Sequence, residues 1–156
     1  MREIEHKFLV VSDAWKKGAT GFDVRQGFLS TDPYRTVRVR VAAGAAFLTI
    51  KGLRVGAEAP EFEYPIPVAD AQDLLENLCL RPLIEKTRYR VEFGGRTWEV
   101  DEFHGVNQGL VIAEMELEHA GQSFARPGWV GEDVTGDPRY SNAKLVERPY
   151  STWKKP

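Results

Sequence analysis

Hydrophobic and polar residues alternate along a series of short segments, which is the pattern of β-strands whose two faces meet different surroundings. In the first segment, at the start of the chain, Glu3, Glu5 and Lys7 fall on one face. About eight such segments are separated by short turn-like stretches, most plainly Gly94–Gly95, which favours antiparallel pairing. The predicted strands are residues 3–10, 23–30, 35–42, 46–52, 61–67, 85–93, 96–103 and 110–118.

Two segments break this alternation. Residues 68–80 place apolar side chains at helical spacing and predict an amphipathic helix, which Pro82 ends. A second, shorter helix is predicted at residues 141–146, with Ser141 as its N-cap. The Gly- and Pro-rich residues 119–139 are predicted to form a loop with at most one helical turn. We therefore expect a mainly β fold with flanking helices, of the α+β class.

The composition is that of an ordinary globular protein, and its 156 residues fit a single domain spanning residues 1–156. A net charge of −2 gives no overall field that would recruit nucleic acid or an anionic membrane, so neither is an expected partner. The single cysteine, Cys79, excludes an intrachain disulfide and suits a reducing compartment. The chain shows no apolar signal region and no long apolar run, so we expect a cytoplasmic protein.

The polar faces of the predicted strands consist almost entirely of ionisable side chains, and their charges segregate by strand. In chain order these faces carry Glu3, Glu5 and Lys7; Arg38 and Arg40; Thr49 and Lys51; Glu61 and Glu63; Lys86, Arg88 and Arg90; Glu99 and Asp101; and Glu114, Glu116 and Glu118. For one strand alone, such a face is most simply exposed to water. Rows of like charge repel, however, and the opposite faces are apolar although only one substantial helix is available to cover them.

Two architectures fit this pattern. One is a β-sandwich with a charged surface, and the other is a closed eight-stranded antiparallel β-barrel whose charged faces line an interior tunnel. In the barrel, helices, loops and a second subunit of a homodimer are the candidates to cover the apolar exterior. A charged interior is costly unless it is compensated, by a divalent cation at the acidic strands and a polyanion at the basic ones. A phosphate chain with Mg²⁺ or Mn²⁺ supplies both, because these hard cations prefer carboxylate and phosphate oxygens.

The order of short motifs resembles the CYTH-domain proteins, the family of triphosphate tunnel metalloenzymes. EIEHKFLV matches the E-x-E-x-K signature of that family, and it is followed in order by RQGFLS, VRVR, TIKG, EFEYPI, EKTRYRV, EVDEF, EMEL and DPRYSNAKL. The resemblance covers residues 3–146, nearly the whole chain. It implies a closed barrel of eight antiparallel strands around a charged tunnel, and activity on a small-molecule triphosphate or polyphosphate with a divalent metal.

The resemblance also implies roles for side chains that the alternation places on one face. It implies metal-linked carboxylates at Glu3, Glu5, Glu114 and Glu116, with Glu61, Glu63 and Asp101 nearby. It implies triphosphate contacts from Lys7, Arg38, Arg40, Lys51, Lys86 and Arg88, to which we add Arg90 from the same face. For catalysis we expect Glu63 or Asp101 to orient or deprotonate the attacking water, and Lys86 to act as a general acid or base.

The function that the resemblance favours is an inorganic triphosphatase, which cleaves tripolyphosphate to pyrophosphate and phosphate with Mg²⁺ or Mn²⁺. A nucleoside or thiamine triphosphatase and a class IV-like adenylyl cyclase are alternatives from the same family. A non-catalytic polyphosphate or nucleotide sensor is an alternative of another class. One position departs from the family pattern, because small bacterial relatives commonly have a tyrosine where this chain has Phe28, which offers no hydroxyl to assist Lys86.

Overall fold

The chain folds into an antiparallel sheet with two α-helices, and the computed structural model describes residues 1–153. The strands are β1 (Arg2–Val10), β2 (Gly21–Ser30), β3 (Thr36–Ala42), β4 (Ala45–Lys51), β5 (Glu58–Ile66), β6 (Ile84–Phe93), β7 (Arg96–Phe103), β8 (Val111–Leu117) and β9 (Val130–Asp133). The helices are α1 (Val68–Asn77) and α2 (Asn142–Glu147), with short 3₁₀ turns at Ala14–Lys16, Gly105–Asn107, Pro138–Tyr140 and Tyr150–Thr152. Within the described residues, no helix has the length and apolar character needed to cross a membrane. The last residues of the expected domain, 154–156, lie outside the described part.

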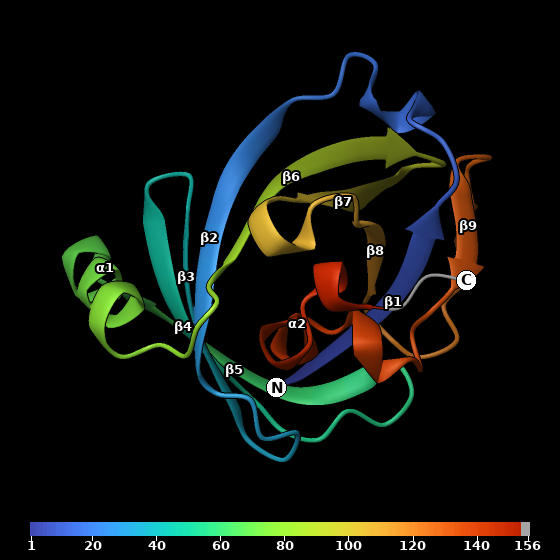
Figure 1. The fold of residues 1–156 in the computed structure, drawn as a ribbon. Coiled ribbons are helices and arrows are strands. Elements are labelled where there is room, and N and C mark those ends of the chain that lie inside the picture. Colours follow the sequence, from blue (N-terminus) through green and yellow to red (C-terminus); the bar gives the residue numbers. More distant parts are fainter. Residues whose placement is uncertain (154–156) are drawn as a thin grey trace.

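Eight strands close into a barrel because β1 pairs with a strand on each of its sides (Figure 1). β1 pairs with β8 from Ile4 to Leu9 and with β5 from Arg2 to Ile4, and the ring continues through β4, β3, β2, β6 and β7 to β8. The turn between β6 and β7 has φ of 61° at Gly94 and 76° at Gly95, conformations that glycine adopts without steric cost. The closed eight-stranded antiparallel barrel is confirmed, and the sandwich with a charged surface is wrong.

The predicted loop at residues 119–139 contains a further strand, β9, so that part of the prediction is wrong. β9 pairs with Phe8 and Val10 near the end of β1, on the side that β5 has already left. Its sequence, VGED, shows no alternation of apolar and polar residues. β1 pairs with β5 only at its start, so the backbone donors and acceptors further along this edge of β1 need another partner. β9 supplies that partner.

The first helix begins as predicted, but α1 ends at Asn77 and not at residue 80. Beyond α1 the chain turns back to the barrel, where the backbone N–H of Leu80 donates to the carbonyl oxygen of Phe28 in β2. This backbone hydrogen bond to a strand replaces the one that another helical turn would have made. The Pro82 ring follows further along and is not what ends the helix.

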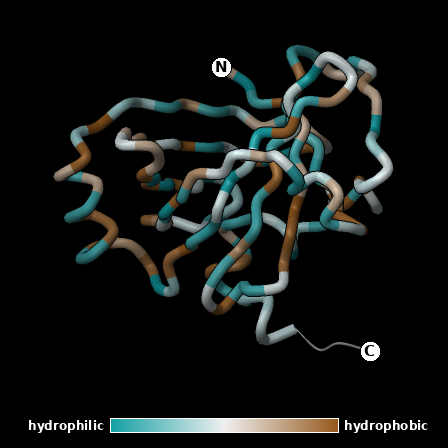
Figure 2. The backbone as a smooth tube through the Cα atoms, turned by 90° about the horizontal axis from the view of Figure 1, so that it is seen from above, coloured by the Kyte–Doolittle hydropathy of each residue, from teal (hydrophilic) through white to brown (hydrophobic). Residues whose placement is uncertain are grey.

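Away from the end that α2 covers, the apolar faces of the strands point outward, and hydrophilic and hydrophobic positions alternate along the tube in Figure 2. α1 covers the exterior of β3 and β4 with a cluster of Val39, Ala46, Ala71, Leu75 and Cys79. A second cluster lies outside β1, β7 and β8 and contains Ile4, Phe8, Trp15, Trp98, Val100, Ala113, Met115, Leu117 and Trp129. On the exterior of β4 and β5, Ile50, Phe62 and Tyr64 stay exposed.

The second helix, α2, lies across one end of the barrel, and it appears in red at the centre of Figure 1. Ser141 caps it as predicted, because its hydroxyl oxygen accepts from the backbone N–H of Lys144. Leu145 of α2 packs against the barrel in an apolar cluster that includes Phe28 and Ile84. The interior of the barrel is therefore apolar beneath α2 and charged beyond it.

Candidate active site

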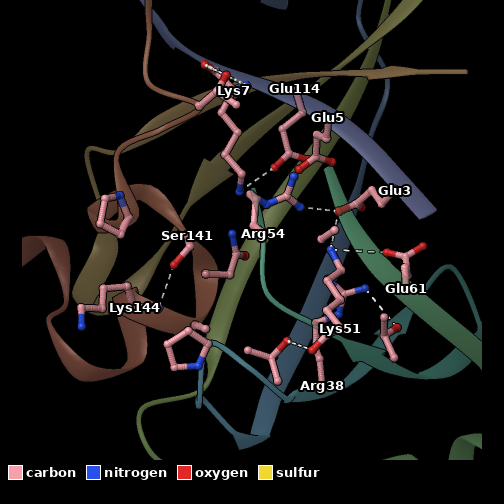
Figure 3. Close-up of a pocket in the computed structure, with 18 of the residues that line it drawn as sticks. Glu3, Glu5, Lys7, Arg38, Lys51, Arg54, Glu61, Glu114, Ser141 and Lys144 are labelled. Atoms are coloured by element: carbon pink, nitrogen blue, oxygen red, sulfur yellow. Dashed lines mark hydrogen bonds and ion pairs between the residues drawn. The ribbon is translucent and has the colours of Figure 1, made fainter. Parts of the chain in front are cut away.

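The barrel encloses a cavity of about 580 Å³ whose walls carry charged side chains from seven strands (Figure 3). The strand period places these side chains there, since alternate residues of each barrel strand face inward. The lining charged residues of the strands are Glu3, Glu5, Lys7, Arg38, Arg40, Lys51, Glu61, Glu63, Lys86, Arg88, Glu99, Glu114 and Glu116. All predicted site residues except Arg90 and Asp101 belong to this set.

β1 and β8 form an acidic wall of the cavity. Glu5 lies opposite Glu116 across this strand pair, and Lys7 lies opposite Glu114 with 3.1 Å between the ammonium and the carboxylate. The Glu5 carboxylate is buried and has no ion pair or hydrogen bond among residues 1–153. Burial and the charges of Glu114 and Glu3 raise the pKa of Glu5 to about 8. Burial and the charge of Glu3 also raise the pKa of Glu116, so this wall holds more carboxylates than its lysine can balance.

Glu3, at the start of β1, accepts hydrogen bonds from two cations. Its Oε1 lies 2.8 Å from Nζ of Lys51 and 2.6 Å from Nη2 of Arg54. Burial opposes ionisation of Glu3, but the charge and hydrogen bond of Lys51 and the charge of Arg54 outweigh it and lower the pKa to about 2. Lys51 is also 3.4 Å from Glu61 on β5. The first glutamate of the signature is thus ionised and held by cations.

Lys86, Arg88 and Asp101 form a buried cluster between β6 and β7. Arg88 donates two hydrogen bonds to Asp101, at 2.7 and 2.9 Å, and Nζ of Lys86 lies 2.7 Å from the same carboxylate. Arg88 also donates to Glu114 at 3.0 Å. Burial lowers the pKa of Lys86 to about 7, and the charge of Asp101 only partly opposes this. Because Arg88 already neutralises Asp101, Lys86 is the cation of the cluster that loses its proton more readily.

Arg38 and Arg40 on β3 keep donors free for an anion. No carboxylate among the described residues forms an ion pair with Arg40, whose Nε donates to Oε1 of Gln26 at 3.1 Å. Burial and the charge of Arg38 lower the pKa of Arg40 to about 10. Arg38 is 3.4 Å from Glu63, but its buried Nε has no hydrogen-bond partner in the described part of the chain. These unused guanidinium donors suit phosphate oxygens.

Two predicted site residues do not line the cavity. Asp101 is fully buried behind Lys86 and Arg88, so its carboxylate holds these two cations in place. The side chain of Arg90 is 63% exposed, and its guanidinium lies 4.9 Å from the centre of the Phe22 ring. Arg90 continues the alternation of β6, but it lies beyond the part of the strand that borders the cavity.

The structure adds Arg54, Gln26 and Asn142 to the site. Arg54 lies on the connection between β4 and β5, and Asn142 is the first residue of α2, so no strand alternation marks either one. Gln26 is buried on β2 beside Asn142, and its place on the inward face of that strand was the one signal the sequence offered. Phe28 lines the cavity two residues further along β2, so the departure from the family pattern lies within the site.

The cavity carboxylates are of the ligand type that a hard divalent cation prefers, but their positions in this structure do not form a metal site. Among residues 1–153, no group of three or more His, Cys, Asp or Glu side chains is arranged to hold a metal ion. The ion pairs explain this, since Glu3 is turned toward Lys51 and Arg54, and Glu114 toward Lys7. Glu5 has no such partner. Mg²⁺ and Mn²⁺ prefer oxygen ligands, and the carboxylates on this wall, which outnumber its cations, offer them.

Comparisons with known proteins agree with this geometry. The family model described as the CYTH domain matches residues 1–150. An inorganic triphosphatase of Acetivibrio thermocellus is 51% identical over 153 residues, which cover 98% of this chain and 98% of the relative. An inorganic triphosphatase of Nitrosomonas europaea is 36% identical over 152 residues, covering 94% of this chain and 97% of the relative.

Solved structures show the same fold. The crystal structure of an inorganic triphosphatase is 34% identical, with a TM-score of 0.64, and covers 92% of this chain and 96% of that one. A structure of a protein from Hippeastrum is 15% identical, with a TM-score of 0.58, and covers 75% of this chain and 80% of that one. The second likeness bears on the fold alone.

Proposed function

The chain belongs to the CYTH family, and we propose that it is an inorganic triphosphatase, a phosphoanhydride hydrolase that cleaves tripolyphosphate to pyrophosphate and phosphate. The observation that carries this proposal is the cavity itself. On its β3 side, Arg40 has no carboxylate partner among the described residues and Nε of Arg38 has no acceptor, whereas the β1–β8 wall holds more carboxylates than cations. A phosphate chain with a divalent metal compensates both kinds of excess charge at once.

The phosphate chain is proposed to lie between the cations that line the cavity. These are Lys7, Arg38, Arg40, Lys51, Lys86 and Arg88. Arg38 and Arg40 have donors free in the described structure, whereas Lys7, Lys51 and Arg88 exchange carboxylate partners for phosphate oxygens. Arginine makes bidentate contacts with phosphate and lysine acts as a point charge, so both kinds of contact are available.

Binding of the phosphate chain also prepares the carboxylates for a metal ion. When Lys7, Lys51 and Arg88 turn to phosphate oxygens, Glu114 is released and Glu3 keeps only Arg54 as a cationic partner among the described residues. Glu3 and Glu114 then join Glu5 and Glu116 as the proposed ligands. Bound Mg²⁺ or Mn²⁺ supplies neutralisation of the phosphate oxygens and activation of water. We propose these two ions because hard carboxylate sites with phosphate favour them. Glu61, at 3.4 Å from Lys51, is a further candidate ligand nearby.

For the chemical step, water attacks the terminal phosphorus, the bond from this phosphorus to its bridging oxygen breaks, and pyrophosphate leaves. Lys86 is proposed to give a proton to the leaving oxygen, since it lines the cavity with a pKa of about 7. Glu63 is proposed to orient the water and accept its proton, because it lines the cavity on β5 and is the more exposed of the two β5 carboxylates there. Asp101 acts on the reaction by holding Lys86 and Arg88.

The test is to incubate the purified protein with tripolyphosphate, ATP or thiamine triphosphate, in Mg²⁺ or Mn²⁺, and to identify every product. We expect metal-dependent phosphate and pyrophosphate from tripolyphosphate, a rate that falls at least about 100-fold in Glu114→Gln, and little change in Glu118→Gln. Glu118→Gln is the matched control, because it is the same glutamate-to-glutamine change directly after β8, at a residue that does not line the cavity. Cyclic AMP from ATP, a preference for an organic triphosphate, or tight binding without turnover would each overturn the proposal.

Three further expectations remain proposals. A homodimer is favoured by the exposed Ile50, Phe62 and Tyr64 on the exterior of β4 and β5, and light scattering of wild type and Phe62→Glu tests it. A cytoplasmic location agrees with the single buried thiol of Cys79, and fractionation of cells tests it. One domain over the whole chain is expected to unfold in a single cooperative transition.

A further inference from the structure

The amine of Lys86 has a partner that comes from outside the barrel. Besides Asp101 on the neighbouring strand, Nζ of Lys86 donates to Oδ1 of Asn142, at 3.0 Å. Asn142 is the first residue of α2 and lies 56 positions away from Lys86 in the sequence. Lys86 is only 2% exposed, so these two acceptors fix where its amine lies.

A chain of obligatory donors fixes the orientation of the Asn142 amide. Arginine has no acceptor, so Nε of Arg40 requires the oxygen of the Gln26 amide, at 3.1 Å. The amide nitrogen of Gln26 then faces Asn142 and donates to Oδ1 at 2.5 Å. The protonated amine of Lys86 is also only a donor, so the same oxygen accepts from both sides. A flip of either amide would set N–H groups against each other.

α2 holds Asn142 rigidly at this point. Ser141 caps the helix immediately before Asn142, and Leu145 is fully buried in the apolar cluster at the end of the barrel. Asn142 and Lys86 therefore meet because α2 is anchored by packing that does not involve the amide. The anchoring lets the amide be replaced while the helix stays in place.

We propose that Asn142, oriented by Gln26, is a positioning residue that aims the amine of Lys86 at the leaving oxygen of the substrate. An ammonium group has three N–H donors, and Asp101 and Asn142 accept two of them. The third is left for a phosphate oxygen, because Lys86 lines the cavity. The inference rests on the proposed function, and it explains how this chain holds Lys86 without a hydroxyl at Phe28.

The test compares kcat and KM for tripolyphosphate in Asn142→Ala and in Asn142→Leu, which keeps the branched shape of the side chain without its amide. We expect kcat to fall by about 10- to 100-fold in both, because a small displacement of a reacting group has effects of this order. KM and the affinity for tripolyphosphate measured by calorimetry are expected to change less than kcat does, since the Asn142 amide oxygen acts on the reaction through Lys86.

Ser141→Ala is the matched control, because it removes the cap of the same helix and leaves the Asn142 amide in place. It should lower the melting temperature but change kcat less than about threefold. Gln26→Leu added to Asn142→Ala should lower kcat little further, since both act through one amine.

Several results would overturn the inference: wild-type kcat in either Asn142 variant, an equal loss of kcat in Ser141→Ala, a loss confined to KM, or failure of both Asn142 variants to fold. Wild-type turnover of tripolyphosphate combined with any of these results leaves the proposed function standing. Absence of turnover in the wild type counts against the proposed function itself.

Discussion

At the scale of single residues, the cavity contains charges that do not stabilise the fold. Arg40 is half-buried, and no carboxylate among the described residues forms an ion pair with it. Glu5 is buried on the opposite wall with its pKa raised to about 8. A buried charge without a partner is unfavourable, so both residues are expected to trade stability of the empty protein for binding.

We predict that Arg40→Met raises KM for tripolyphosphate at least about tenfold without lowering the melting temperature, because it removes phosphate donors and an uncompensated buried cation together. Steady-state kinetics and thermal unfolding without ligands measure the two effects. Arg90→Met is the comparison, since the side chain of Arg90 is 63% exposed and outside the cavity lining. A lower melting temperature with unchanged KM in Arg40→Met would show that Arg40 belongs to the fold.

The second prediction at this scale concerns pH and the metal-free protein. The pKa of Glu5 is raised from its ordinary value of 4.5 to about 8, so the folded state keeps a proton that the unfolded state has lost. Stability from this group is therefore present below pH 4.5 and is lost as the pH rises toward 8. Glu5→Gln should remove the loss and be more stable than the wild type by about 1 kcal/mol or more near pH ~8, roughly 2–4 °C in melting temperature.

The measurement is thermal unfolding of both proteins in a chelator between pH ~5 and ~8. The difference in melting temperature between Glu5→Gln and the wild type should grow with pH. A constant difference would mean that Glu5 titrates in the folded protein as it does in water.

At the scale of elements, the residues that the alternation did not mark come from connections and from α2. The connection between β4 and β5 carries Arg54, which donates to the carbonyl oxygen of Ala57 and to the Glu3 carboxylate. Figure 3 shows the Arg54 guanidinium beside Glu3 within the pocket, where a metal ligand is proposed. An internal cation thus occupies a carboxylate that we propose as a metal ligand.

We predict that Arg54→Gln binds Mn²⁺ more tightly than the wild type in the absence of substrate, by about three- to tenfold, because a competing cation worth about 1 kcal/mol is removed from Glu3. Calorimetric titration with Mn²⁺ alone measures this. Arg35→Gln is a suitable control, as Arg35 is an exposed arginine paired with Asp32 on another loop. Weaker Mn²⁺ binding in Arg54→Gln would show that Arg54 organises the carboxylates and does not compete for them.

At the scale of the whole molecule, closure of the barrel joins the two kinds of excess charge in one space. The acidic wall is formed by β1 and β8, and the free guanidinium donors come from β3. We expect each ligand to release groups that the other uses, because Lys7 pairs with Glu114 and Lys51 pairs with Glu3 in the described structure. Metal and phosphate chain are therefore expected to bind cooperatively.

We predict that Mg²⁺ and tripolyphosphate together raise the melting temperature of the Lys86→Met variant, which we expect to be inactive, by more than the sum of their separate effects. Bound ligand at ~100 times its dissociation constant adds about 2.7 kcal/mol of stability, which is readily measured. A matrix of both concentrations gives the coupling free energy. Strictly additive shifts would show that the two sites do not share Lys7, Lys51, Glu3 and Glu114.

The sequence alone determined much of this protein, because a strand has a period of two that depends only on local geometry. Glu3, Glu5 and Lys7, and the corresponding residues of the other strands, face one interior because their apolar neighbours must face the other way. Ser141 marked the start of α2 for a similarly local reason, since its side chain reaches the backbone three residues ahead. The order of motifs then distinguished the barrel from the sandwich.

Only the tertiary structure decided which of these charges meet. β9 exists because β1 has a free edge, and Arg90 leaves the cavity because β6 continues past it. Arg54 and Asn142 reach Glu3 and Lys86 from 51 and 56 positions away, across loops and α2 whose paths no local period describes. Hydrogen bonding and burial depend on distances in space and not on separation along the chain. The partners of Lys86 and the unpaired state of Glu5 therefore follow from the closed barrel and not from any local segment of the sequence.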